Sequence, residues 1–499
     1  MRLVTAQEQV RGLELPCKVR LDSYYKSLST DRFNTSCDGR MVKALLEVAK
    51  DPEMVQDEID YLKKVQFSQA VYEFKQIKEQ LERFEAPNEP NLYGRSKPYR
   101  DAKAYWMRQV SGWRLRSLDY NRNADIKDCV PRKDAVAGYS WIETGKRYKG
   151  DYMDTLHQDY HSHEEKARRE GSNNKPILIM TRTQGGGQYK DDGTRSGKCD
   201  YKSRFISAID IMQVMMEMKF AKPFQDRMGR VKWYAGGKDD KNIAACIYRM
   251  RKRVKRYWKS LDYSKYDQSI SDWLIYDAFD IVRAAFTGDT FFDDELFNIV
   301  KHDFVNKVFL MPGRGPVFSK KGVPSGSMFT QIIDTLVNLL MITTYMNAKN
   351  IDVYDMMIMG DDNLVYIGVD VDTKNMEEYL KHNFGITMNH KKVKFGEYED
   401  YPQFLSRTWT PEGVYREPRE MIAKLCWPEQ FRNYRLNKDL SPWMILDAYM
   451  QTFPRGMLKL VNTKLLQHKT AREMSNLGQS KYHSGLMRYM IEYQDELIS

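Results

Sequence analysis

Residues 354–368 read YDMMIMGDDNLVYIG, and the fold is organised around this stretch. Two apolar runs, 356–359 and 364–367, flank the cluster Gly-Asp-Asp-Asn at 360–363. Bulky apolar residues around such a cluster predict a β-hairpin. Its tip carries two adjacent carboxylates, which suit divalent cations better than a structural role. The tripeptide Gly-Asp-Asp is not specific alone, so its meaning depends on whether other acids converge on it.

Composition bounds the class of protein. The chain has 499 residues, of which 42% are hydrophobic and 29% charged, so we expect a globular protein of two to four subdomains. The formal net charge of +11 comes from 79 Lys and Arg against 68 Asp and Glu. This excess favours a polyanionic partner such as nucleic acid, although a merely basic protein is equally compatible with charge alone.

The sequence gives no support for a disulfide-rich protein, a zinc site or a membrane span. The six cysteines form no C-x-x-C pair, which predicts no disulfide framework and fits a reducing compartment. His157, His161 and His163 lie in a charged run without further metal-ligand spacing, so we interpret them as a solvated helix face. No apolar signal core opens the chain, and no apolar run approaches the ~18 residues of a membrane span.

The first half of the chain reads as helices followed by a basic, aromatic region. Residues 1–90 have helical spacing, and a Pro/Asn-rich break follows at 86–91. The loop 181–188 contains three consecutive glycines and is followed by five bases, so it either guides a phosphate backbone or is a plain flexible loop. Residues 227–234 alternate bases with apolar residues, and in a strand Arg230 and Lys232 would present two cations to one anionic group.

Two further polar features lie between this region and the hairpin. A strand-like run ends at Asp262, a turn leads to Asp267, and a helix is predicted from about residue 273. Residues 322–330 read GVPSGSMFT and open a long apolar helix. Thr330, Asp334 and Asn338 recur every four residues and share one face of it, which is either solvated or used by a ligand.

The C-terminal part of the chain, from residue 384, contains further predicted helices and strands. Residues 384–395 read as a helix end, a turn and a strand that carries three lysines. Residues 403–409 read as one strand of a second hairpin, and residues 411–499 as mainly helical.

The order of these features resembles the viral RNA-dependent RNA polymerases. Asp262 to Asp267 matches their motif A, Ser325 to Asn338 motif B, and Gly360-Asp361-Asp362 motif C. Residues 391–394 fit motif D, 404–407 motif E, and the strand with Arg227, Arg230 and Lys232 motif F. The string GVPSGSxFTQxxD is most similar to the polymerases of small double-stranded RNA viruses, picobirnaviruses first and partitiviruses second.

The resemblance implies an α+β, right-hand polymerase with an antiparallel palm sheet packed on helices. It implies a helical segment at 1–90 that bridges fingers and thumb, fingers at 91–255 and a helical thumb at 411–499. The palm would comprise 256–283 and 323–410, with a fingers insertion at 284–322.

The resemblance also assigns roles. Asp262, Asp361 and Asp362 would hold two Mg²⁺ ions, with Mn²⁺ as a substitute, and the main chain of Tyr263 would assist. A lysine of motif D would protonate pyrophosphate; spacing leaves Lys391, Lys392 and Lys394 open, and we favour Lys392. The implied nucleotide contacts are Arg227, Arg230, Lys232, Asp267, Ser325, Gly326, Thr330, Asp334 and Asn338. The implied RNA contacts are Arg182, Gly185, Gly186, Gly187, Arg195 and Arg407.

Asp334 departs from the pattern of picornavirus-like polymerases, which carry an Asn in the ribose pocket there. Asp267, Ser325 and Asp334 would select ribonucleotides, and two carboxylates in one pocket predict a raised pKa for one of them. The expected partners are template and product RNA, NTPs and a capsid protein. The expected state is a monomer without a membrane, in the virion interior and the host cytoplasm.

Two rival interpretations remain. A reverse transcriptase shares the palm but usually has an aromatic pair before its two acids, where this chain has Met359 and Gly360. It also usually lacks a second acid in motif A, where this chain has Asp267. A non-catalytic RNA-binding virion protein would not need all three candidate metal ligands intact.

Overall fold

The computed structural model describes residues 11, 13–30, 32–34, 37–49, 51–68, 70–91, 96–121, 123–173, 175–184, 186, 202–390, 392–411, 413–429, 442 and 445–446. The chain divides into two compact units. The first comprises Met1–Thr30, Ile77–Thr181 and Phe205–Pro402, and the second Asp31–Gln76, Arg182–Arg204 and Gln403–Ser499.

The predicted hairpin forms one side of a four-stranded sheet in the first unit. Strands β8 (Tyr354–Met359) and β9 (Asp362–Ile367) pair antiparallel across a turn at Gly360 and Asp361. β9 also pairs with β5 (Tyr257–Ser260), and β5 pairs with β10 (Lys394–Glu397). The order β10-β5-β9-β8 is antiparallel throughout, which confirms the predicted kind of sheet.

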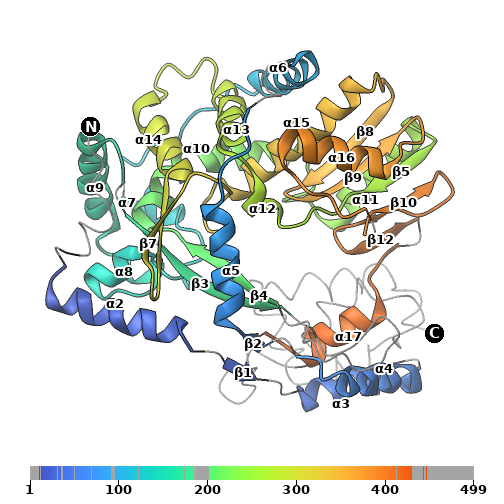
Figure 1. The fold of residues 1–499 in the computed structure, drawn as a ribbon, viewed down its shortest axis with the longest axis horizontal. Helices are drawn as coiled ribbons and strands as arrows, with labels where there is room; N and C mark the ends of the chain where they lie inside the picture. The colour runs from blue at the N-terminus through green and yellow to red at the C-terminus, as the bar shows by residue number, and fades with distance from the viewer. Residues whose placement is uncertain are drawn as a thin grey trace. The chain divides into compact units, whose positions relative to one another are not determined.

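A long buried helix supports this sheet. Helix α15 (Thr330–Ala348) packs on β8 and on α6 (Lys97–Ser111), α13 (Asp272–Ala284) and α16 (Thr373–Phe384) (Figure 1). Its side chains from Ile332 to Met346 are all buried. Polar residues among them therefore need partners inside the protein, because an unpaired buried polar group is costly.

A second sheet has the order β4-β3-β6-β7. Strand β3 (Ile177–Gln184) pairs in parallel with β6 (Lys307–Met311), and β6 pairs antiparallel with β7 (Gly315–Ser319). Strand β4 (Lys202–Ala208) leads into α10 (Ile211–Met228), which packs on α9 (Leu156–Glu170) and α14 (Asp294–Val305). The other helices of this unit are α2 (Leu15–Leu28), α5 (Phe74–Glu85), α7 (Asn123–Asp128), α8 (Tyr139–Thr144), η1 (Lys149–Tyr152), α11 (Asp240–Arg253) and α12 (Tyr266–Ser269).

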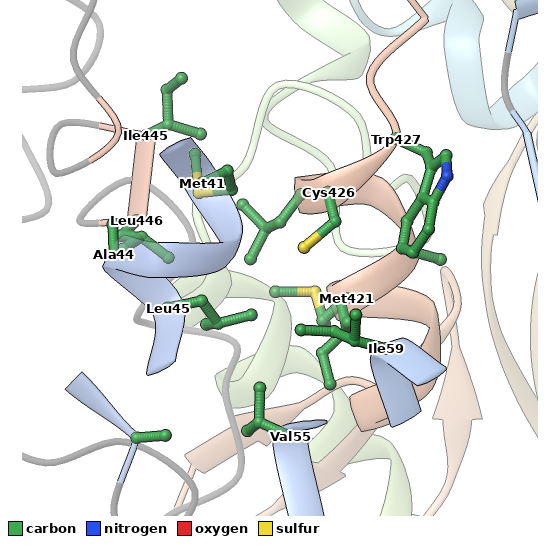
Figure 2. Close-up of a cluster of buried hydrophobic side chains, with 14 of the residues drawn as sticks. Met41, Ala44, Leu45, Val55, Ile59, Met421, Cys426, Trp427, Ile445 and Leu446 are labelled. Atoms are coloured by element: carbon green, nitrogen blue, oxygen red, sulfur yellow. The ribbon is translucent and has the colours of Figure 1, made fainter. Parts of the chain in front are cut away.

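The second unit has its own core. Helices α3 (Gly39–Val48), α4 (Pro52–Lys64) and α17 (Pro418–Cys426) pack on one another. Figure 2 shows Met41 and Leu45 of α3, Ile59 of α4 and Met421 of α17 in one buried cluster. This unit also contains the pair β1 (Arg32–Asn34) and β2 (Ala70–Tyr72), and a sheet of β11 (Gln403–Phe404), β12 (Arg407–Thr410) and β13 (Gly413–Tyr415).

Two predicted elements are wrong. Residues 227–234 form no strand, because α10 continues to Met228 and a series of turns follows. Residues 403–409 are a complete hairpin rather than one strand, since Leu405 and Ser406 turn the chain with φ angles of 56° and 55°. Two-residue turns of this kind usually carry Asn-Gly. Because this turn carries Leu-Ser, the sequence did not indicate it. The short strand β13 also interrupts the region predicted to be mainly helical.

Other predictions are confirmed by the elements. Helix α5 ends at Glu85, before the predicted break at 86–91, and α13 and α15 lie where helices were predicted. α16 ends at Phe384, and the chain then turns toward β10. As separate findings that confirm no prediction, five cysteines among the described residues are free, and no described helix is long and apolar enough to cross a membrane. The predicted boundaries of fingers, palm and thumb stay predictions.

Candidate active site

The turn between β8 and β9 is fastened to α15 by buried polar groups. The Gly360 N–H donates to Thr335 Oγ1 over 2.9 Å, and Asn338 Nδ2 donates to the carbonyls of Gly360 (2.9 Å) and Asp361 (3.3 Å). Gly360 has φ 66°, and a Cβ there would lie 2.9 Å from Gln331 Nε2. Glycine at 360 is therefore required both by the backbone conformation and by the close approach of α15.

Strand β5 brings a third acid to this turn. Lys259 pairs with Val365, and continuing that antiparallel register places Asp262 across from Asp362. The Leu261 N–H donates to Asn363 Oδ1 (3.0 Å), which fixes this end of the pairing. Asp361 and Asp362 are exposed and Asp262 is half-buried, so the three carboxylates lie at one end of neighbouring strands and can be reached from solvent.

These acids offer the oxygen donors that Mg²⁺ prefers. Across the described ranges, no group of three His, Cys, Asp or Glu side chains is arranged to hold a metal ion by itself. Mg²⁺ usually takes one or two carboxylates and completes its octahedral shell with waters and substrate phosphates. The chemistry of Asp262, Asp361 and Asp362 therefore fits Mg²⁺ that is bound together with a nucleotide.

Tyr263 supports the site through its buried side chain. Its hydroxyl donates to Asn338 Oδ1 (2.9 Å), and its ring stacks on that of Tyr266 with centroids 5.0 Å apart. Only the main chain of Tyr263 is thus left for the predicted contact with a metal. Asn338 is fully buried and uses both amide atoms within the protein. Asn338 therefore holds the turn, and its predicted contact with a nucleotide stays a prediction.

The predicted ribose-sensing acids are electrostatically coupled. Burial raises the pKa of Asp334 well above its usual value, and Asp267 and Asp361 raise it further. This raised pKa favours the neutral form of Asp334 and confirms the prediction that one acid of the pair has a raised pKa. Within the described residues, Asp334 Oδ1 is buried without a hydrogen-bond partner. Asp267 is half-buried, and its carbonyl accepts from the Val323 N–H (2.7 Å), which ties it to the loop before α15.

That loop presents Ser325 to solvent. Ser325 is exposed, and its Oγ accepts from the Ser207 N–H of β4 over 3.0 Å. A Cβ at Gly326 would lie 1.7 Å from the Ser207 carbonyl, so only glycine fits there. The Thr330 hydroxyl donates to the carbonyls of Pro324 (2.6 Å) and Ser327 (2.8 Å). The Thr330 hydroxyl thus shapes the loop, and its predicted contact with a nucleotide stays a prediction.

Two of the three predicted basic residues near this site lie on irregular backbone. Arg227 is in the last turn of α10, with its guanidinium 5.7 Å from the ring centre of Trp113, whereas Arg230 and Lys232 are exposed in turns. Lys238 Nζ closes these turns by donating to the carbonyls of Gly229, Val231 and Tyr234 at 2.6–2.8 Å. The prediction that Arg230 and Lys232 share one face of a strand is therefore wrong.

Lys392 lies close to the acids along a chain of main-chain bonds. Its N–H donates to the Asn389 carbonyl (2.9 Å), and the Asn389 N–H donates to the Asp262 carbonyl (2.8 Å). The Lys392 side chain is exposed, as is that of Lys394 on β10. Lys391 lies outside the described residues, so the choice among the three lysines stays a prediction.

The predicted RNA contacts that are described lie in the second unit. Arg182 Nε lies 3.2 Å from Glu429, Gly186 pairs with Ser68 through two main-chain bonds, and Arg407 is part of β12. Gly185, Gly187 and Arg195 lie outside the described residues. The role of these residues in RNA binding stays a prediction.

Sequence reasoning missed several residues that build the site. Gln331 and Thr335 meet the turn together with Asn338, whereas the predicted stripe was Thr330, Asp334 and Asn338. Residues three or four positions apart lie on one face of a helix, and this holds for each of the two sets. Helical spacing alone therefore could not tell which set meets the turn. Asn363 directly follows the two acids and accepts a hydrogen bond from the Leu261 N–H. Its position after Gly-Asp-Asp was the indication in the sequence that it belongs to the site.

The sequence matches a known family of proteins. A family model described as viral RNA-dependent RNA polymerase matches residues 75–430, well over half of the chain. The chain belongs to this family. The predicted resemblance to these polymerases is thereby confirmed, and motifs A to E of the sequence analysis all lie within the matched range.

Curated relatives match over shorter stretches. The RNA-directed RNA polymerase of Cryptosporidium parvum virus 1 (strain KSU-1) is 28% identical over 178 residues, which are 33% of this chain and 32% of the relative. The genome polyprotein of Human parechovirus 2 (strain Williamson) is 24% identical over 263 residues, 47% of this chain and 11% of the relative. The matches thus span about a third or less of the length of these relatives.

Solved structures share the fold. The RNA-dependent RNA polymerase of a human picobirnavirus matches with a TM-score of 0.60 and 14% identity, over 86% of this chain and 82% of that chain. Its insertion-loop deletion mutant matches with a TM-score of 0.62 and 12% identity, over 86% and 84% of the two chains. The predicted α+β polymerase fold is confirmed by this similarity.

Proposed function

We propose that this chain is an RNA-directed RNA polymerase that works by two-metal nucleotidyl transfer. The observation that carries the proposal is the meeting of Asp262, Asp361 and Asp362 at one solvent-open end of the sheet, beside a turn that α15 holds in place. A turn with two acids has no structural need for such fastening. A site that must hold carboxylates at fixed separation does need it.

In this proposal Asp262 and Asp361 would hold two Mg²⁺ ions, and Asp362 and the main chain of Tyr263 would assist. When bound, such ions lower the pKa of the attacking 3′-hydroxyl and neutralise charge on the triphosphate. Exposed Arg230 and Lys232 and half-buried Arg227 supply further positive charge for the triphosphate. Lys392 donates a proton to the pyrophosphate that leaves.

Ribonucleotide choice is assigned to Asp267, Asp334 and Ser325. A neutral Asp334 can donate a hydrogen bond as well as accept one, so it can replace the amide that picornavirus-like polymerases carry there. The Ser325 hydroxyl accepts from the Ser207 N–H and can still donate its own hydrogen. A 2′-hydroxyl would pair with these groups, and a deoxyribose would leave them unpaired.

The biological setting follows from the family resemblance. We propose that the chain replicates and transcribes a viral, double-stranded RNA genome, as a monomer that meets a capsid protein in the virion interior and acts in the host cytoplasm. Template and product RNA would contact Arg182, Arg195, Arg407 and the loop at Gly185, Gly186 and Gly187. The net charge of +11 supports binding of RNA.

Primer extension on an RNA template tests the proposal directly. We expect NTP incorporation that requires Mg²⁺ or Mn²⁺ and is absent from Asp361→Asn, a variant that keeps the shape of the side chain but loses its charge. The matched control is Asp355→Asn, a half-buried acid on β8 outside the turn. Equal activity of Asp361→Asn and the parent protein would contradict the proposal.

A further inference from the structure

A buried acid on α10 holds the loop that carries Ser325. Glu217 is 1% exposed, and its Oε2 accepts both from the Ser327 hydroxyl (2.8 Å) and from the Met328 N–H (2.7 Å). Its Oε1 accepts from Gln213 Nε2 over 3.2 Å. A buried carboxylate is costly unless it is bonded, and here two of the three bonds serve the loop.

The same loop is held from its other side by β4. The Ser207 N–H donates to Ser325 Oγ, and Gly326 lies directly against the Ser207 carbonyl. Gln225 of α10 adds a bond from its Nε2 to the Met328 carbonyl (2.7 Å). Residues 325–328 are therefore held between a strand and a helix, and the position of Ser325 depends on both contacts.

We propose that Glu217 is a positioning residue for ribonucleotide selection: its carboxylate fixes residues 327 and 328 so that Ser325 is presented to the sugar of the incoming nucleotide. The inference rests on the proposed polymerase function. Glu217 itself faces away from the nucleotide, because it is fully buried between α10 and the loop. It acts only through the backbone and the hydroxyl that it holds.

The charge state of Glu217 is set by opposing effects. Burial raises the pKa of Glu217 to about 7. The hydrogen bonds from the loop and from Gln213, and the charge on Lys149, act in the opposite direction and lower it. Lys149 is the cation that faces it from η1; burial lowers the pKa of Lys149 in turn, while Arg132 and Asp210 act on Lys149 in opposite directions. Glu217 is then ionised above about pH 7 and neutral below, and the neutral acid is the weaker acceptor.

The test compares Glu217→Ala and Glu217→Gln with Asp210→Asn. Asp210 is a suitable control because it is equally buried and caps the start of the same helix, but bonds to Ser140 and Met212 rather than to the loop. Incorporation of NTP and of the matching dNTP on an RNA template is measured for each variant, as kcat and KM. The parent protein and Asp361→Asn are run beside them.

We expect Glu217→Ala to lower the NTP preference over dNTP about tenfold, the scale of one lost buried hydrogen bond, while dNTP kinetics barely change. Glu217→Gln keeps the preference, because its oxygen can accept from the loop and its amide can face the Gln213 oxygen, which has no partner within the described residues. The preference of the parent protein falls as pH drops from 8 to 6, and that of Glu217→Gln does not.

A parental NTP preference in Glu217→Ala, or a parental pH profile in Glu217→Gln, would overturn the inference. If Glu217→Ala does not fold, the pH profile of Glu217→Gln decides alone. A uniform loss of NTP and dNTP incorporation would also overturn it, because that pattern indicates general destabilisation. These failures are distinct from failure of the proposed function, in which the parent protein incorporates no nucleotide at all.

Discussion

The turn at Gly360–Asp361 and the loop at residues 325–328 are both fastened by side chains of a helix, but those side chains differ in kind. Thr335 and Asn338 hold the turn, and both are neutral and fully buried. Glu217 holds the loop, and its pKa of about 7 lies near neutrality. The turn with the candidate metal ligands is thus held by side chains that do not titrate near neutral pH. The loop beside the sugar is held by a side chain that does.

The largest expected effect lies on the turn side of this comparison. Asp262→Ala should abolish nucleotide incorporation and leave RNA binding close to that of the parent protein, because phosphate contacts dominate RNA affinity. Fluorescence anisotropy with labelled RNA, beside primer extension, measures both. Parallel loss of RNA binding would indicate misfolding and remove support for the assigned metal site.

Asp267→Ala should have the next largest effect, on the loop side. It removes one acid beside the sugar, so NTP incorporation should fall by tenfold or more while dNTP incorporation changes little, an order of magnitude typical of a lost polar contact. Competition between NTP and dNTP in one reaction measures the ratio. A variant with the parental ratio would show that Asp267 does not sense the ribose.

Thr335→Val tests the support of the turn. Valine keeps the shape but leaves the Gly360 N–H unpaired, which should lower the free energy of unfolding by about 1–3 kcal/mol and raise the Mg²⁺ concentration needed for activity. The control is Thr344→Val, equally buried in α15, whose hydroxyl bonds only to Leu340 of its own helix. Urea unfolding and Mg²⁺ titrations of both variants give the comparison, and equal behaviour would contradict it.

The smallest effect on activity is expected for Asp334→Asn, because a neutral acid and an amide are similar in shape and charge. The variant should differ from the parent protein mainly in its stability against unfolding. The pKa of Asp334 is raised on folding from its usual value near 3.8, so the folded parent binds an extra proton and loses stability as pH rises above that value. Asp334→Asn lacks this loss, so its stability relative to the parent protein should increase as pH rises above that value. Urea unfolding with a chelator present checks this, and a pH-independent difference would rule out a neutral Asp334.

Much of the site could be predicted from local sequence. The hairpin at 354–368, the acid at the end of β5 and the helix after the Ser-Gly loop follow from patterns that repeat every two or every 3.6 residues. These patterns reflect the backbone geometry of single elements. They do not report which neighbour a buried polar side chain will meet, and for this reason the bonds of Thr330 to the loop and of Asn338 to the turn were not predicted.

By itself, the sequence determined the family, the order of the elements and the candidate metal ligands, because these depend on residues close together in the chain. Only the tertiary structure decided which polar groups of α15 hold the turn, that Arg230 and Lys232 lie on turns, and that Glu217 holds the loop from 110 residues away. Contacts at such separations depend on how helices and strands pack. The pKa values of Asp334 and Glu217 were likewise decided by burial, which no short stretch of sequence specifies.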